Sequence, residues 1–121
     1  TLRKSYGGAH DVMSCKQLRG DFNYAWPTAQ IAVMGAKGAI EVLYGKEVAA
    51  ITDPEAKAKF IAEKEEEYNH AFANPYKAAS YGYIDDVIEP RNTRFRVIRA
   101  FQSLQTKRVT NPMKKHSNIP L

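Results

Sequence analysis

Apolar positions in the first 44 residues form short runs that are broken by glycines and prolines. Residues 1–5 have the character of an extended lead-in to a pair of glycines. Val12, Cys15 and Leu18 then recur every three residues, which predicts a short helix over 11–18 that ends at Gly20. The apolar runs further along predict extended segments over 24–26 and 30–34 and a helix over 35–44.

The second half of the chain shows longer helical patterns with clear boundaries. Asp53-Pro54 is a strong helix start, because aspartate accepts hydrogen bonds at the N-cap and proline fits the first helical position. This helix is expected to run to about Ala73 with its larger apolar residues inward: Phe60, Ile61, Tyr68 and Phe72. After a stop at Asn74-Pro75, the pattern predicts a short helix over 76–80, a strand over 82–87, and a helix from Asn92 or Thr93 to about Thr106 that buries Phe95, Ile98, Phe101 and Leu104.

The composition fits a mixed α/β unit with a modest core. The chain has 121 residues, of which 44% are apolar, and no run approaches the roughly 20 apolar residues that span a bilayer. No membrane partner is therefore expected. Cys15 is the single cysteine, which rules out an internal disulfide and suits a reducing compartment.

The net charge of +5 is unevenly distributed. Residues 90–121 hold eight Arg or Lys residues and no acid, whereas residues 1–89 carry a net charge of −3. A basic region of this kind suits a polyanion, and a stand-alone nucleic-acid-binding module stays open as an alternative. No nucleic-acid-binding motif supports that alternative, and CoA is also a polyanion.

The pair Gly7-Gly8, followed by a plausible helical turn, is the strongest candidate for chemistry. Glycines allow a sharp turn that brings bare backbone N–H groups against a ligand. Such donors stabilise an oxygen that acquires negative charge, as in the oxyanion hole of acyl or carboxyl chemistry. The alternative is a tight turn with no further role.

Three motifs in the chain resemble the C-terminal half of the biotin-dependent acyl-CoA carboxyltransferases. They are Ser5-Tyr6-Gly7-Gly8-Ala9-His10-Asp11-Val12-Met13, the stretch from Gly20 to Ala39 with Asn23-Tyr24-Ala25-Trp26-Pro27, and the ending Lys114-Lys115-His116-Ser117-Asn118-Ile119-Pro120-Leu121. They occur in the family's order and span nearly the whole chain. The branch that acts on propionyl-CoA is the most similar.

The resemblance implies an α/β fold, namely the later part of a crotonase-like (ClpP/crotonase) carboxyltransferase domain. Residues 1–106 would form this partial domain, and 107–121 would be a basic tail packed on another surface. The family's subunits are several times longer and hold two related domains. We therefore expect the chain to be a piece of a longer protein and not to fold stably alone.

The resemblance also implies an activity. A carboxyl group would move from carboxybiotin to propionyl-CoA to give methylmalonyl-CoA. The backbone N–H groups of Gly8 and Ala9 would form the oxyanion hole that faces biotin, and Gly7 would shape the turn. Met34 and Gly35 would border the biotin pocket.

Asp11 and His10 fall where the family selects the acyl group. Asp11 could instead serve only as the N-cap of the short helix. His10 stands where the propionyl branch is expected to have tyrosine, and a partly exposed packing role is preferred over a general base. Cys15 is expected to be a small buried residue, and no metal site is expected.

The family's cofactor and partners complete the expectation. Biotin would arrive on a biotin carboxylase or biotin carrier subunit, and none would be bound covalently here. The other partners would be acyl-CoA, an N-terminal carboxyltransferase domain and further copies in a hexamer, in the cytoplasm or in the mitochondrial matrix of a eukaryote. A methylmalonyl-CoA decarboxylase or transcarboxylase subunit, an acetyl-CoA carboxylase β subunit and a non-catalytic assembly subunit stay open as alternatives.

Overall fold

Two short pairs of parallel strands lie at the centre of the chain, in a computed structural model that describes residues 1–110. β1 (Lys4–Tyr6) pairs with β3 (Gln30–Ala32), and β2 (Tyr24–Ala25) pairs with β4 (Asp86–Val87). Parallel partners need a crossover connection, so these pairs join segments that are far apart in sequence. The extended segment expected over 30–34 ends at Ala32. The strand expected over 82–87 holds only two paired residues, because β2 offers no more partners.

The first helix differs from the prediction. α1 (Gly7–Val12) begins four residues before the expected start at Asp11. Gly7 has φ +51°, a left-handed conformation that lets β1 turn directly into the helix. Ser14, also left-handed at φ 69°, separates α1 from the short 3-10 turn η1 (Lys16–Leu18). The prediction of one helix over 11–18 is therefore wrong.

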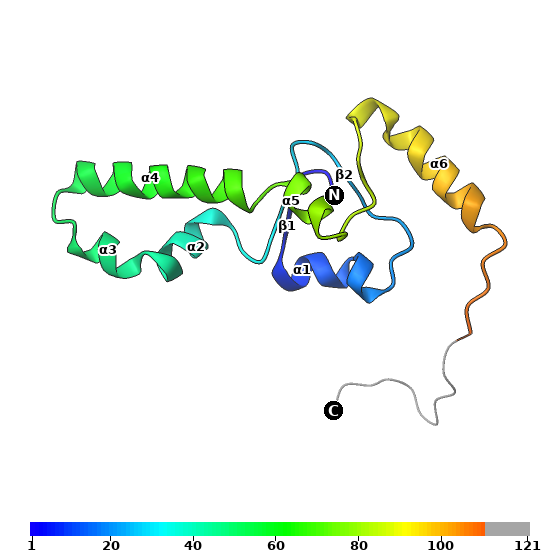
Figure 1. The fold of residues 1–121 in the computed structure, drawn as a ribbon, viewed down its shortest axis with the longest axis horizontal. Helices are drawn as coiled ribbons and strands as arrows, with labels where there is room; N and C mark the ends of the chain where they lie inside the picture. The colour runs from blue at the N-terminus through cyan, green and yellow to red at the C-terminus, as the bar shows by residue number, and fades with distance from the viewer. Residues whose placement is uncertain (111–121) are drawn as a thin grey trace, which may run out of the picture.

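Three helices form an arm that projects from the strands (Figure 1). They are α2 (Ala36–Leu43), α3 (Gly45–Ala50) and α4 (Pro54–Ala71), and α4 runs back along the other two. The predicted cap of α4 is confirmed, since the Asp53 carboxylate accepts the backbone N–H groups of Glu55 and Ala56 at 3.4 and 3.1 Å. No residue of α4 is fully buried, and Phe72 at its end is 54% exposed. The inward face predicted for this helix is thus only partly covered.

The core lies where α5 (Pro75–Ser80) packs against the strands. Its cap follows the expected local rule, because Asn74 accepts the Lys77 backbone N–H at 2.8 Å and proline takes the first helical position. The core cluster is small and consists largely of alanine and isoleucine: Ala25, Ala29, Ile31, Ala78 and Ile84. A core of this size buries little apolar area and therefore contributes little stabilisation.

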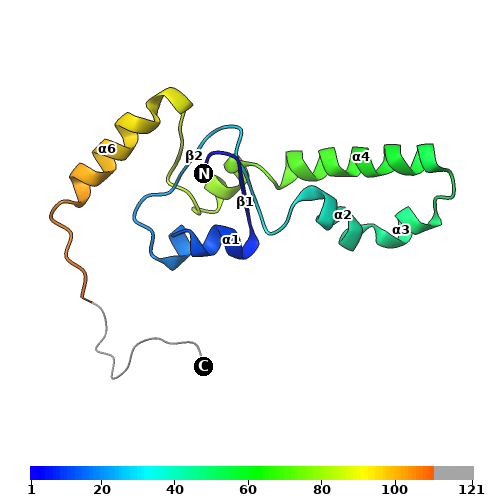
Figure 2. The same ribbon diagram turned by 180° about the vertical axis from the view of Figure 1, so that it is seen from behind.

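The last helix stands away from the rest on the side opposite the arm (Figures 1 and 2). The short turn η2 (Pro90–Asn92) leads into α6 (Thr93–Leu104). The side chain of Trp26 donates to Thr93 Oγ1 at 2.8 Å, and Arg96 forms an ion pair with Asp86. Three residues predicted to be buried in α6 are instead exposed by 43 to 70%: Phe95, Ile98 and Phe101. That prediction is wrong for the described chain, because no element within 1–110 covers this face.

The exposed apolar side chains fit an incomplete domain. Large apolar residues are exposed on α1, on the arm and on α6, and a complete domain would cover much of this area. Among residues 1–110, no helix combines the length and the apolar character needed to cross a membrane. The tail predicted over 107–121 lies mostly outside the described residues, which end at Thr110.

Candidate functional site

The turn at Gly7-Gly8 presents backbone donors without a side-chain cap. Tyr6 occupies the N-cap of α1 in an extended conformation and makes no capping hydrogen bond through its side chain. The first-turn N–H groups of a helix have no intrahelical partner, so those of Gly8 and Ala9 are not used within α1. The turn requires glycine at its first position, since a Cβ on Gly7 would lie 2.9 Å from the Val33 carbonyl oxygen.

A cavity of about 590 Å³ opens beside this turn. Its volume is in the range of small-molecule sites. It is bounded by α1, β3, the ends of α2 and α4, and the α5 region. The lining residues are Gly7, Gly8, His10, Asp11, Gln17, Ile31, Ala32, Val33, Leu43, Tyr68, Phe72, Lys77, Ala78, Tyr81 and Tyr83.

The predicted site residues divide into two groups. Gly7, Gly8, His10 and Asp11 line the cavity, whereas Ala9, Met34 and Gly35 do not. The Met34 carbonyl accepts the Tyr68 hydroxyl at 3.2 Å, which ties the start of α2 to α4. A Cβ on Gly35 would lie 3.2 Å from the Tyr6 ring, so this glycine permits close packing behind the turn. Four residues of the predicted glycine motif therefore line this cavity, and their roles in binding stay predictions.

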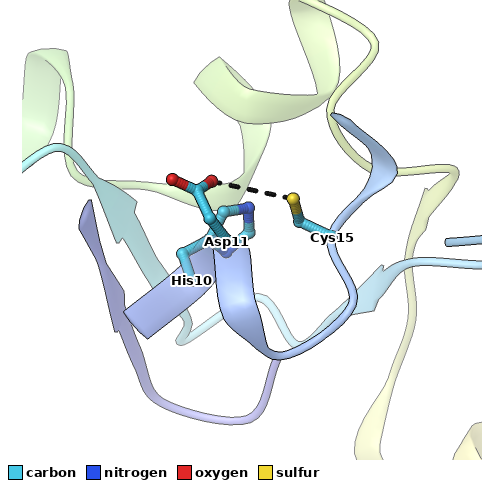
Figure 3. Close-up of side chains that lie close together, drawn as sticks. All are labelled: His10, Asp11 and Cys15. Carbon is cyan, nitrogen blue, oxygen red and sulfur yellow. Dashed lines mark hydrogen bonds between the residues drawn. The ribbon is translucent and has the colours of Figure 1, made fainter. Parts of the chain in front are cut away.

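Asp11 does not cap a helix. It lies in the second turn of α1, past the donors that an N-cap would satisfy, so the capping interpretation is wrong. Its side chain is directed toward Cys15, whose thiol donates to Asp11 Oδ1 at 3.6 Å (Figure 3). Cys15 is 1% exposed, which confirms the expected small buried residue.

His10 is half-buried and has two different ring environments. Its Nδ1 is joined to Ser5 Oγ by a hydrogen bond of 2.7 Å, while its Nε2 is buried and has no hydrogen-bond partner. A buried polar atom without a partner is uncommon and calls for an explanation. One ligand-type atom from each of His10, Asp11 and Cys15 lies within 4.8 Å of the others. This grouping was not predicted from the sequence, although the spacing of residues 10, 11 and 15 in and just after a helix could have indicated it.

Several polar lining residues come from distant parts of the chain and were not predicted. Lys77 lies on α5 with its ammonium 4.9 Å from the centre of the Tyr81 ring, a cation–π contact. Tyr68, near the end of α4, also lines the cavity. No local signal marks these residues, because about 60 to 70 positions separate them from the glycine turn. The packing of α5 against β3 and of α4 along α2 brings them to one cavity.

Three interactions hold this region in place. Tyr6 donates its hydroxyl to Gln30 Oε1, and burial, with Tyr68 nearby, raises the pKa of the Tyr6 phenol. Asp85 pairs with Lys16 and accepts the Asn23 backbone N–H at 2.7 Å. Burial acts to raise the pKa of Asp85, but these hydrogen bonds outweigh it and the pKa is lowered. These contacts fasten η1 to the segment before β4.

Comparison with known proteins places these features in a family. The propionyl-CoA carboxylase beta chain of Cereibacter sphaeroides is 60% identical over 119 residues, which are 98% of this chain and 22% of that relative. The methylmalonyl-CoA carboxyltransferase 12S subunit of Propionibacterium freudenreichii subsp. shermanii is 50% identical over 119 residues, with the same coverage of 98% and 22%. The chain thus spans about one fifth of the length of these curated relatives, 22% in each.

Solved structures confirm the fold expected from the sequence. A transcarboxylase 12S structure, described as a hexamer assembly with methylmalonyl-coenzyme A bound, matches with a TM-score of 0.84 at 50% identity over 99% of this chain and 22% of that one. The β subunit of P. aeruginosa geranyl-CoA carboxylase matches with a TM-score of 0.64 at 25% identity over 86% of this chain and 22% of that one. The expectation of a partial α/β carboxyltransferase domain is confirmed. Residues 1–119 match the family model of the carboxyl transferase domain, and the chain belongs to this family.

Proposed function

We propose that the protein containing this chain transfers a carboxyl group between carboxybiotin and propionyl-CoA, and that the chain supplies the biotin-facing part of the active site. The observation that carries this proposal is the 60% identity to a propionyl-CoA carboxylase beta chain over 98% of the chain. The cavity beside the uncapped turn of α1 supports it, because the reaction needs donors for an oxygen that gains charge.

The backbone donors fit the biotin group that the family implies. When bound, biotin supplies the carboxyl group and accepts negative charge on its ureido oxygen. The N–H groups of Gly8 and Ala9 would donate hydrogen bonds to that oxygen, and they need no reorganisation because the helix fixes them. Gly8 itself is open to a ligand, since a Cβ placed there would meet no atom within 4 Å. In our proposal a partner subunit or domain carries the biotin.

The acyl end of the cavity is assigned to Asp11 and His10. Both line the cavity together with Gly8 and would shape the space open to the acyl chain. The aromatic rings of Tyr68 and Phe72, which also line the cavity, would exclude water from the reacting groups. We propose that the remainder of the protein supplies the thioester-binding half.

A second candidate is the same transfer in the opposite direction. A methylmalonyl-CoA decarboxylase alpha subunit of Propionigenium modestum and the 12S transcarboxylase subunit are each 50% identical to this chain. Both act on methylmalonyl-CoA by name, and the oxyanion donors would serve either direction equally.

The exposed apolar face of α6 is assigned to assembly. Phe95, Ile98 and Phe101 form a face that a complete protein would cover, and the related 12S structure is a hexamer assembly. We assign this face to the remainder of the protein or to a second copy. We propose that the protein works in the cytoplasm or, in a eukaryote, in the mitochondrial matrix; one relative, from Rattus norvegicus, is mitochondrial by name.

The experiment is a transfer assay on the full-length protein. Incubation with methylmalonyl-CoA and free biotin should yield propionyl-CoA at a rate that rises with the biotin concentration. Malonyl-CoA, which leads to acetyl-CoA, is the matched control and should react more slowly. An intact oligomer that converts neither thioester would contradict the proposal and favour a non-catalytic assembly role. Tight, salt-dependent binding of nucleic acid would instead favour the alternative class of function.

A further inference from the structure

We propose that His10, Asp11 and Cys15 form a binding site for a zinc-class divalent metal ion at the edge of the cavity. One potential ligand atom from each residue lies within 4.8 Å of the others. The three side chains converge from α1 and the loop that follows it (Figure 3). Imidazole, carboxylate and thiolate are the ligands that zinc uses in proteins.

The distance between the sulfur and the carboxylate oxygen fits one ion. Ligands at about 2.3 Å for sulfur and 2.0 Å for oxygen, separated by a tetrahedral angle, lie about 3.5 Å apart. The Cys15 Sγ and Asp11 Oδ1 atoms are 3.6 Å apart. A metal ion could therefore replace the proton that now lies between these two atoms, with little movement of either side chain.

His10 has a ring nitrogen that is free to bind a ligand. In the tautomer whose Nδ1–H donates to Ser5 Oγ, the lone pair of Nε2 is free. Metal-bound histidines commonly donate their other ring nitrogen to a fixed acceptor, which sets the ring orientation. Nε2 is buried and has no hydrogen-bond partner, and a metal would give it one.

The ligand set selects the class of ion. Binding requires Cys15 to release its thiol proton to solvent, so that one thiolate and one carboxylate balance a divalent ion. A sulfur and a nitrogen ligand favour zinc or cobalt over magnesium or calcium, which prefer oxygen. Three protein ligands leave a fourth position open. Because His10 and Asp11 line the cavity, that position would face the cavity.

Metal binding at this site would also regulate carboxyl transfer, and this consequence, unlike the site itself, rests on the proposed function. An ion bound here would alter the space beside Gly8 and slow carboxyl transfer. The site also departs from the expectation, based on sequence, that the chain holds no metal.

Cobalt(II) tests the site independently of activity. Titration of the metal-free full-length protein with Co²⁺ should produce the thiolate-to-cobalt charge-transfer absorption and the intense visible bands of tetrahedral cobalt. Cys15→Ser should abolish the charge-transfer absorption, and Asp11→Asn should weaken binding about 10-fold or more. His70→Asn, an exposed histidine on α4, is the matched control and should bind like the wild type.

Asp11→Asn keeps the test decisive if the buried Cys15 variant does not fold, because Asp11 is exposed and asparagine has the same shape. Wild-type protein without thiolate absorption would overturn the proposal. Absorption that persists in Cys15→Ser, or unchanged affinity in Asp11→Asn, would overturn it as well. If zinc abolishes transfer activity but cobalt gives no thiolate absorption, the inhibiting ion binds elsewhere, and this result would also overturn the proposal.

Discussion

The clearest structural prediction concerns the two glycines of the turn, which look equivalent in sequence but have different environments. Gly7→Ala forces an alanine into the left-handed region, which costs about 1–2 kcal/mol. It also places a Cβ 2.9 Å from the Val33 carbonyl oxygen, a backbone atom directly after β3. Local stability of the β1–α1 junction should therefore fall by about 2 kcal/mol or more.

Gly8→Ala is the matched control. Its Cβ meets nothing within 4 Å, and its φ is not left-handed. Alanine in a helix is favoured over glycine by about 0.5–1 kcal/mol, so the helix itself should be slightly stabilised. The two substitutions add the same methyl group at adjacent positions and should change stability in opposite directions.

Hydrogen exchange of the full-length protein, followed in peptides that cover 4–13, measures this difference. A loss of 2 kcal/mol corresponds to about 30-fold faster exchange in Gly7→Ala. Gly8→Ala should exchange at the wild-type rate or more slowly. Equal protection in Gly7→Ala and wild type would refute the strained turn, and equal loss in both variants would refute the assignment of strain to Gly7.

Two further predictions test the surroundings of the site. Asp85→Asn removes the ion pair with Lys16 and should lower the free energy of unfolding by about 0.5–1 kcal/mol near neutral pH, measured by urea unfolding. The pKa of Asp85 is lowered in the folded state, so the difference in unfolding free energy between wild type and Asp85→Asn should be full above the ordinary aspartate pKa. This difference should vanish as the pH falls through the lowered pKa. A difference that does not change with pH would contradict this. Phe101→Glu on the apolar face of α6 should shift the full-length protein toward smaller species in sedimentation velocity. The control Gln102→Glu, at an exposed neighbouring position, should leave the species unchanged. Equal assembly of both variants would contradict the assigned interface.

Features fixed by neighbouring residues could be predicted from the sequence. The Asp53 cap and the Asn74-Pro75 boundary depend on side chains within three positions of the atoms they satisfy, and both were correctly expected. The glycine turn was recognised for the same reason. The helix after this turn begins earlier than predicted, because the left-handed conformation of Gly7 joins β1 directly to α1 with no loop between them.

Features fixed by distant or external contacts could not be predicted. Apolar residues recur along one face of α6 as predicted, but no element among the described residues covers this face, so Phe95 and Phe101 remain exposed. Lys77 reaches the cavity only because α5 packs against β3. The grouping of His10 with Cys15 depends on the break at Ser14, which turns the chain back toward α1.

The rate of carboxyl transfer by the full-length Ala9→Pro variant tests the central proposal most directly. Proline removes the Ala9 N–H but is tolerated in the first turn of a helix, where no intrahelical bond is lost. Ala9→Gly keeps the donor and serves as the control for the effect on the helix. We predict that Ala9→Pro assembles normally but transfers about 100-fold more slowly, with a far smaller loss in Ala9→Gly. Wild-type turnover in an assembled Ala9→Pro protein would contradict the assignment of this backbone donor to the reaction.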